Sequence, residues 1–253
     1  MVTLVPQAVV AVLVGLAVCQ VAIVLTTVYL HRTISHRSVT MVPAVRAVCR
    51  VLLWVTTGIR PRQWAAVHRR HHAHTDAEGD PHSPVLDGFW KVLLGNVGLY
   101  RHAIRDGVTV DRYAKDIPPD AWDRYLFDHS LLGLSLGIGA LCLLLGWEWG
   151  LVAAAVHTVS YLLLNGAVNA VGHSFGRQPY PNKARNTGWL ALLTAGEGWH
   201  NNHHAAPTSA RLGRTRREVD FGWWLIQFLV WRRWATVRLT QARPKATAPS
   251  SSG

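Results

Sequence analysis

Residues 4–36 read LVPQAVVAVLVGLAVCQVAIVLTTVYLHRTISH, so a long apolar run leads directly into two histidines, His31 and His36. The run from Leu4 to Leu30 contains no Lys or Arg, and it exceeds the roughly 20 apolar residues that a membrane-spanning helix needs. It therefore predicts a transmembrane helix over residues 4–30, with a pair of histidines at its end.

A second apolar block covers residues 131–169 and is long enough for two more spans. No Lys or Arg occurs between Leu131 and Val168. The block is interrupted at 146–150 (GWEWG), where two tryptophans suit a membrane interface. We therefore predict spans at about 131–147 and 149–169, joined by a tight turn.

The basic residues predict the orientation of these spans. All 26 Lys and Arg residues lie in 31–130 or after Asn169, so the segments that carry them should be cytosolic and the N-terminus should be outside. The net charge of +12 favours anionic lipid headgroups or an acidic partner. Nucleic acid is a poor partner, because the charges flank spans and no nucleic-acid recognition motif is present.

Two further apolar segments should lie at the membrane surface. Residues 41–59 contain Arg46 and Arg50, which are costly inside a bilayer, and a span there would separate the histidines across the membrane. Residues 221–239 mix tryptophans with arginines, as interfacial helices do. The predicted fold is an all-α membrane protein with about three transmembrane helices, interfacial helices and a cytosolic histidine-rich helical cap. It forms one domain over 1–242, followed by a disordered tail over 243–253.

Nine of the 14 histidines are candidate metal ligands. Residues 68–72 (HRRHH) and 200–204 (HNNHH) repeat one spacing, and positions i, i+3 and i+4 share a helix face. Asn169 and His173 form another i, i+4 pair, whereas His31 and His36 would be splayed by about 140° on a straight helix and need a bend or a helix end at Ser35. Two metal ions with four or five nitrogen ligands each would use the whole set, which comprises His31, His36, His68, His71, His72, His173, His200, His203 and His204.

The five other histidines have simpler interpretations. His129 and His157 are expected to be structural residues in an apolar setting. His74 and His82 are expected in a loop beside the site, and His102 at the surface. For the nine clustered histidines the competing interpretation is a solvated basic face, but three separate clusters that meet at one membrane surface favour a metal site.

The types of residue present narrow the metal chemistry. The His-Glu-x-x-His motif of hydrolytic zinc sites is absent, as are thiolate ligand sets and the Glu-x-x-His motif of soluble di-iron proteins. An all-histidine dinuclear centre at the mouth of a membrane bundle suits iron that activates O2 against an apolar substrate, an inference that rests partly on the family resemblance described next.

These histidine boxes resemble those of the membrane-bound fatty acid desaturases, most closely the stearoyl-CoA or acyl-lipid Δ9 group of bacterial type. Residues 80–84 (DPHSP), 169–173 (NAVGH), 176–180 (GRQPY), 185–186 (RN) and 196–199 (GEGW) extend the likeness, which covers roughly residues 22–240. The resemblance implies a di-iron centre held by the nine histidines, with Asn169 reaching one metal through water. It also implies that O2 and two electrons introduce a cis double bond into a saturated acyl chain.

The resemblance suggests roles for six other residues. Trp64, one turn before His68, is a candidate for the wall of an acyl tunnel, with an ordinary interfacial tryptophan as the alternative. Arg69 and Arg101 are candidates for contacts to a phosphorylated headgroup, with solvated surface charge as the alternative. Three acidic residues are candidates for orienting imidazoles, namely Asp76, Asp80 and Glu197.

The N-terminus departs from the animal enzymes, which place a hairpin of two spans before the first box, whereas this chain has room for one. Some bacterial desaturases with the 56–58 stretch (TTG) and Trp64 also begin in this way, and some of them act on acyl chains in phospholipids. The acyl carrier is therefore open between CoA, phospholipid and carrier protein. Electrons should come from a separate protein such as a ferredoxin, and the expected location is a bacterial plasma membrane with the active site on the cytosolic face.

Two other classes of function are compatible with these boxes. A hydroxylase or acetylenase of the same superfamily would use the same oxidant. A non-catalytic membrane metal-binding or transport protein would instead place its ligands along a pathway within the spans, whereas these clusters lie at the span ends.

Overall fold

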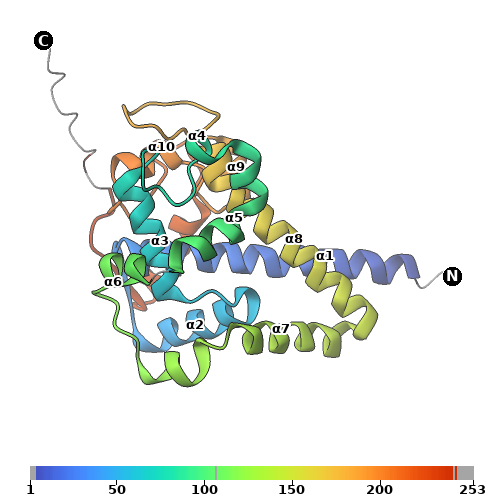
Figure 1. The fold of residues 1–253 in the computed structure, drawn as a ribbon. Helices are drawn as coiled ribbons and strands as arrows, with labels where there is room; N and C mark the ends of the chain where they lie inside the picture. Colours follow the sequence, from blue (N-terminus) through green and yellow to red (C-terminus); the bar gives the residue numbers. More distant parts are fainter. Residues whose placement is uncertain (1–3, 106, 242, 244–253) are drawn as a thin grey trace, which may run out of the picture.

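The computed structural model describes residues 4–105, 107–241 and 243, and it is mostly helical. Figure 1 shows the helix α1 (Leu4–Leu25) extending away from a cluster of shorter helices, with the N-terminus at its far end. The other helices are η1 (Thr26–Ser35), α2 (Pro43–Thr57), α3 (Pro61–His74), α4 (Pro84–Asp87), α5 (Phe89–Ile104), α6 (Val108–Tyr113), η2 (Asp123–Phe127), α7 (Ser130–Leu145), α8 (Trp147–Gly172), α9 (Gly188–Leu193), α10 (His200–Ala205) and α11 (Phe221–Trp231).

Two helices of the described chain are long and apolar enough to cross a membrane. One is the continuous helix Pro6–Ser35, in which α1 runs into the π-helix η1, and the other is α8. The first predicted span, over 4–30, is therefore part of a longer helix that includes His31. The predicted span over 131–147 corresponds to α7, which has 16 residues and is shorter than the roughly 20 that a span needs.

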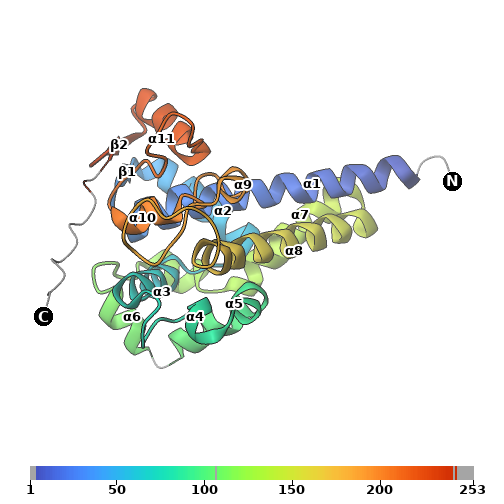
Figure 2. The same cartoon turned by 90° about the horizontal axis from the view of Figure 1, so that it is seen from above.

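The apolar helices α1, α7 and α8 pack together through α8. Figure 2 shows α7 and α8 running along α1, and α8 packs against both of its neighbours. The approach of α1 to α8 is close, because a Cβ added at Gly15 would lie 2.5 Å from the carbonyl oxygen of Ala153. Gly146 separates α7 from α8 with φ of +83°, so the predicted turn is present and begins at this glycine.

A two-stranded antiparallel sheet modifies the expected all-α fold. The strand β1 (Val39–Met41) pairs with β2 (Ala235–Val237), and Val39 lies opposite Val237. The predicted helix over 221–239 is consequently wrong beyond Trp231, where α11 ends. Arg233 adopts a left-handed φ of +60°, and this turns the chain from α11 into the strand that hydrogen-bonds to β1.

The histidine-rich end of the molecule is built on a compact apolar core. The predicted surface helix over 41–59 is observed as α2, which begins at Pro43 and ends at Thr57. The next residue, Gly58, has a left-handed φ of +64°. Side chains from η1, β1, α2, α11 and β2 meet in one cluster, which includes Leu30, Leu53 and Ile226, all without exposure. This core fixes η1 relative to the C-terminal segment. The predicted disordered tail, apart from Arg243, lies outside the described residues.

Candidate metal centre

The nine candidate histidines converge from four segments of the chain. They lie on η1 and its end, on α3, at the end of α8 and on α10. Figure 2 shows α3, α10 and the C-terminal end of α8 meeting at the end of the molecule remote from the N-terminus. The side chains form two adjacent groups, one of five histidines (His31, His36, His68, His72 and His203) and one of four (His71, His173, His200 and His204).

In the five-histidine group the Nε2 atoms lie close to one another. The Nε2 of His36 lies 2.7 Å from that of His68. The Nε2 of His203 lies 3.0 Å from that of His31 and 2.8 Å from that of His72. Each ring therefore directs the same nitrogen toward a common centre.

The four-histidine group has the same arrangement. Its Nε2 atoms form a chain in which His71 contacts His204 at 3.3 Å, His204 contacts His200 at 3.2 Å, and His200 contacts His173 at 3.0 Å. All four residues are buried. The repeated spacing in 68–72 and 200–204 divides each box between the two groups. The first and last histidines of a box, four residues apart, belong to one group, and the middle one belongs to the other.

A π-helix brings His31 and His36 together. A π-helix is hydrogen-bonded between residues i and i+5, and the backbone N–H of His36 donates to the carbonyl of His31 at 3.0 Å. Residues five apart therefore lie above one another along the helix. The rings of the two histidines meet edge to face, with centroids 4.8 Å apart. The helix ends at Ser35, one of the two possibilities that the sequence raised, but the convergence comes from the π-helical hydrogen bonding.

Three buried carboxylates contact the Nδ1 atoms of three of these histidines. Glu197 lies 2.8 Å from His31, Asp80 lies 3.0 Å from His71, and Asp76 lies 2.7 Å from His173. These are the three acidic residues that the sequence offered as candidates for orienting imidazoles.

The carboxylates also have partners of their own, which keep them in place. The hydroxyl of Thr27 donates to Glu197, and that of Ser83 donates to Asp76. The backbone N–H groups of Asp76 and His82 donate to Asp80.

The electrostatics of the site keep the carboxylates charged. Burial would raise the pKa of Asp80, but hydrogen bonding and attraction from His71 outweigh it and hold that pKa at about 2. Burial would likewise raise the pKa values of Asp76 and Glu197. Hydrogen bonding and attraction from His173 for Asp76, and from His31 for Glu197, outweigh burial and lower both pKa values. An ionised carboxylate only accepts hydrogen bonds, so the contacted Nδ1 of each imidazole carries a proton and the Nε2 is the nitrogen directed into the histidine group.

The imidazoles are held in the neutral form that binds metals. Burial, reinforced by the neighbouring rings, lowers the pKa values of five of them well below the ordinary value of 6.5. These are His68, His72, His200, His203 and His204. A neutral imidazole offers a free lone pair to a metal ion, whereas a protonated one does not.

The contacts within the four-histidine group cannot all be hydrogen bonds. Each Nε2 atom either donates through one proton or accepts through one lone pair, so it can form one hydrogen bond in the ring plane. Four such atoms can satisfy only two of the three Nε2–Nε2 contacts. A cation shared by the four lone pairs would satisfy them all, and cis nitrogen ligands about 2.1 Å from one metal ion lie about 3 Å apart. The donor set therefore fits a histidine-bound metal.

The structure places the other candidate residues at different distances from the centre. Asn169 is half-buried in the last turn of α8, four residues before His173. Trp64 stacks on His68, with ring centroids 4.9 Å apart and planes within 9°. Arg69 forms an ion pair with Asp116 at 2.5 Å and donates to the carbonyl of Ser35. Arg101 is exposed on α5, which supplies none of the nine histidines.

The five remaining histidines largely follow their simpler interpretations. His82 lies beside the site, with its ring centroid 4.7 Å from that of His71. His74 contacts the hydroxyl of Tyr113, His102 is exposed and His157 is buried. His129, expected to be a structural residue in an apolar setting, is exposed and directly precedes α7.

Two asparagines inside the third box carry a structural role that the sequence analysis missed. The side-chain amide of Asn201 donates to the carbonyls of Tyr180 and Ala184, and that of Asn202 donates to the carbonyl of Leu212. Both side chains are buried. They fasten α10 to the segments on either side of it, and their position between metal-ligand candidates was the only available signal.

Fold and site together define a mostly helical protein with long apolar helices and two adjacent histidine clusters capable of binding metal ions. Comparison with known sequences identifies the family to which the chain belongs. The chain belongs to the fatty acid desaturase family, because residues 6–219 match the family model described as fatty acid desaturase.

Several curated desaturases are similar to this chain. An sn-1 stearoyl-lipid 9-desaturase of Synechocystis sp. is 34% identical over 209 residues, which cover 80% of this chain and 63% of that protein. A protein of the same description from Anabaena variabilis is 32% identical, with 80% and 74% covered. An acyl-CoA C20 Delta5-desaturase of Anemone leveillei is 30% identical, with 83% and 68% covered. The chain thus spans less than two thirds of the length of the Synechocystis relative.

Proposed function

We propose that this chain is a fatty acyl desaturase with a di-iron centre. The observation that carries the proposal is the convergence of nine Nε2 atoms into one group of five and one of four. The family match and relatives named for desaturation of lipid-bound or CoA-bound acyl chains support it.

Each histidine group would hold one iron ion, with Asn169 reaching the four-histidine group through a water molecule. Two bound iron ions would supply O2 activation and the removal of two hydrogens from the acyl chain. The balanced reaction combines one –CH2–CH2– unit, O2, two electrons and two protons, and it forms one cis –CH=CH– unit and two waters. The carboxylates of Asp76, Asp80 and Glu197 fix the Nδ1 protons and hold the rings in orientation.

The substrate is proposed to be a saturated chain desaturated at Δ9. Relatives described as sn-1 stearoyl-lipid 9-desaturases favour this position and a lipid carrier, while the relative described as an acyl-CoA desaturase keeps acyl-CoA as an alternative. Trp64 would line the acyl path, because it stacks directly on His68. Arg69 and Arg101 remain proposed headgroup contacts, although Arg69 already pairs with Asp116.

We further propose that α1, α7 and α8 span a bacterial plasma membrane, with the centre on the cytosolic face. The short helix α7 exposes large apolar side chains along its length, including Leu131 (80% exposed) and Leu143 (91%), which a bilayer would cover. Residues 1–242 would form the desaturase domain, with α2 and α11 at the interface. Electrons would come from a separate protein.

The test is expression of the full chain in a bacterial host, followed by mass spectrometry of the lipids with double-bond positions mapped. We expect new Δ9 monounsaturated chains, about two iron atoms per purified chain, and loss of both in His71→Ala. The matched control is His102→Ala, which removes an exposed histidine from α5. Hydroxylated products would contradict desaturation, and unchanged lipids with iron bound would contradict the enzymatic proposal.

A further inference from the structure

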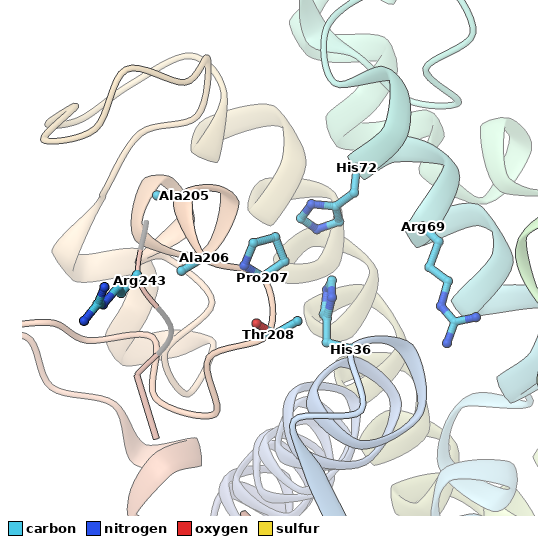
Figure 3. Close-up of a pocket in the computed structure, with 8 residues that line it drawn as sticks. All are labelled: His36, Arg69, His72, Ala205, Ala206, Pro207, Thr208 and Arg243. Carbon is cyan, nitrogen blue, oxygen red and sulfur yellow. The ribbon is translucent and has the colours of Figure 1, made fainter. Parts of the chain in front are cut away.

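The two histidine groups differ in how they meet the exterior of the molecule. Figure 3 shows two members of the five-histidine group, His36 and His72, side by side at a surface pocket that Thr208 also lines. The described residues that line this pocket include no member of the four-histidine group, and all four of those histidines are buried. A metal ion can therefore reach the first group directly, whereas its path to the second must pass other residues.

His82 is a half-buried histidine beside the four-histidine group. Its ring centroid lies 4.7 Å from that of His71, and the two ring planes are inclined by 33°. The Nε2 of His82 is enclosed by protein and has no hydrogen-bond partner among the described residues. Because an enclosed polar nitrogen without a partner is unfavourable, such an atom marks a place for a water molecule or an ion.

The carboxylate of Asp80 completes a cluster with His71 and His82. One potential ligand atom from each residue lies within 4.8 Å of the others, which is close enough for them to hold a metal ion. Both oxygens of Asp80 face the Nδ1 of His71 at 3.0 Å, and the backbone N–H groups of Asp76 and His82 donate to the same carboxylate. A carboxylate has about four lone-pair sites, so these three protons leave one site for a metal ion.

The turn between α3 and α4 holds this cluster in place. The guanidinium of Arg70 donates to the carbonyl of Gly79 at 2.8 Å, and the amine of Lys183 donates to the carbonyl of Asp76 at 2.7 Å. Contacts from α3 and from the segment after α8 therefore fasten the turn on the N-terminal side of Asp80. The cluster is thus positioned by the folded chain itself and does not need a metal ion in order to form.

The cluster is also placed to pass an ion inward. It shares His71 with the four-histidine group, so an ion bound by Asp80 and His82 lies beside a ligand of the buried group. Carboxylate and imidazole together are ligands that Fe2+ accepts in proteins. The buried group offers four imidazoles instead of one, and it should hold the ion more firmly. The ion can then move inward by exchanging ligands without returning to water.

We propose that Asp80 and His82 form a staging site through which Fe2+ enters the four-histidine group. The inference rests on the metal-binding part of the proposed function. The ion keeps its charge throughout, and only ligands are exchanged. Water leaves the ion at the staging site, and the Nε2 atoms of the buried histidines then replace Asp80 and His82. The five-histidine group is loaded separately, from the pocket in Figure 3.

The test follows metal uptake by the full, metal-free chain in lipid nanodiscs after anaerobic stopped-flow mixing with Co2+. The visible absorption of Co2+ depends on its coordination number, so uptake by the two histidine groups should give two distinguishable phases. The variant His82→Phe keeps a planar ring and removes both nitrogens. We expect the phase of the four-histidine group to slow on the order of tenfold, with the other phase and the final metal content unchanged.

A second variant makes the staging site visible. His82→Cys restores a metal ligand at this position, so it should take up Co2+ at close to the parent rate. A cobalt–thiolate charge-transfer band should rise and then decay as the ion moves inward. This band also decides the matter if His82→Phe does not fold, because its absence would overturn the staging site.

Two control variants test for other routes. His74→Phe removes a half-buried histidine near the same turn, whose Nε2 contacts Tyr113, and it should change neither phase. Thr208→Trp obstructs the pocket in Figure 3 and should slow only the phase of the five-histidine group. If it slowed both phases, the ion would reach the buried group through the five-histidine group, and the staging site would be wrong.

Two results with His82→Phe would also overturn the inference. An unchanged four-histidine phase would show that the ion enters elsewhere, and a lower metal content at equilibrium would make His82 a resident ligand instead of a staging one. A parent chain that binds no metal would contradict the proposed function itself. Failure of the proposed function is therefore distinguishable from failure of this inference.

Discussion

The guanidinium of Arg32 donates to the carboxylate of Asp220 at 2.8 Å, and both side chains are only 1% exposed. This ion pair joins the residue after His31 to the segment that follows the third histidine box. Asp220 also accepts from the backbone N–H groups of Leu212 and Trp223, the latter at the start of α11. The pair is thus a buried connection between the first and last contributors to the centre.

We expect Asp220→Ala to be strongly destabilising, because it leaves the Arg32 charge buried without a partner. The loss should be about 3–5 kcal/mol, observed as a large fall in the thermal midpoint in detergent. Asp111→Ala, which removes the exposed partner of Arg62, should cost less than about 1 kcal/mol. Similar midpoints for the two variants would show that the buried pair is dispensable.

Asp80→Asn should weaken metal binding without unfolding the protein. The amide cannot hold the Nδ1 proton of His71 as a carboxylate does, and loss of such a partner typically costs 10- to 100-fold in metal affinity, about 1.4–2.7 kcal/mol. Iron content after dialysis against a chelator is the measurement. Asp87→Asn, at a partly exposed carboxylate paired with Lys91, should retain iron like the parent chain.

Acidification should destabilise the protein as the pH falls below about 6.5. The pKa values of His68, His72, His200, His203 and His204 are lowered by burial and by neighbouring rings, so the unfolded chain takes up protons that the folded chain does not. Each such histidine contributes up to about 1.4 kcal/mol per pH unit below 6.5.

The carboxylate of Asp80, with a pKa of about 2, stays charged over that range and loses its contribution only below about pH 4. Thermal midpoints between pH 7.5 and 5 test the histidine effect, with iron release followed in parallel. A midpoint independent of pH over this range would contradict buried neutral imidazoles.

Trp64→Ala should impair turnover while leaving the metal in place. The indole stacks on His68 and is proposed to border the acyl path, so its removal loses about 0.5–1.5 kcal/mol of ring contact and opens space beside the centre. We expect roughly a tenfold fall in product formed per iron. Trp90→Ala removes a tryptophan that is 69% exposed on α5 and should be silent. Loss of iron from the Trp64 variant would instead assign the tryptophan a structural role.

Gly166→Ala should disturb the packing of α5 on α8. A Cβ at this position would lie 2.2 Å from the carbonyl oxygen of Leu93, which is backbone and cannot move aside on its own. We expect the free energy of unfolding to fall by about 1–3 kcal/mol, observed as a lower thermal midpoint. Gly139→Ala on α7 meets open space and should be neutral or stabilising by up to about 1 kcal/mol.

Spacing and apolar length were enough to predict much of the site and of the scaffold. The i, i+3, i+4 pattern of 68–72 and 200–204 follows from helix geometry, and both boxes are helical in the structure. The apolar runs likewise predicted the long helices that end at the histidines. Local periodicity is sufficient where one helix alone determines which side chains share a face.

Features that depend on contacts between distant segments were not predictable. The π-helix at His31 follows no recognised local pattern, and β2 forms only because β1, almost 200 residues earlier, presents an edge to it. The division of the histidines into five and four also depends on how α3, α8 and α10 pack. The pairing of each carboxylate with one particular histidine has the same cause.

The β1–β2 pairing also has a consequence for the order of biosynthesis. Val39 lies in the segment just after His36, and its partner Val237 leaves the ribosome almost 200 residues later. The first apolar helix can enter a bilayer long before that moment. The histidine His31 that it carries nevertheless cannot reach Glu197 and His203 until those residues have also been synthesised. Iron loading should accordingly follow the synthesis of the third histidine box, and nascent chains arrested before residue 200 should carry none.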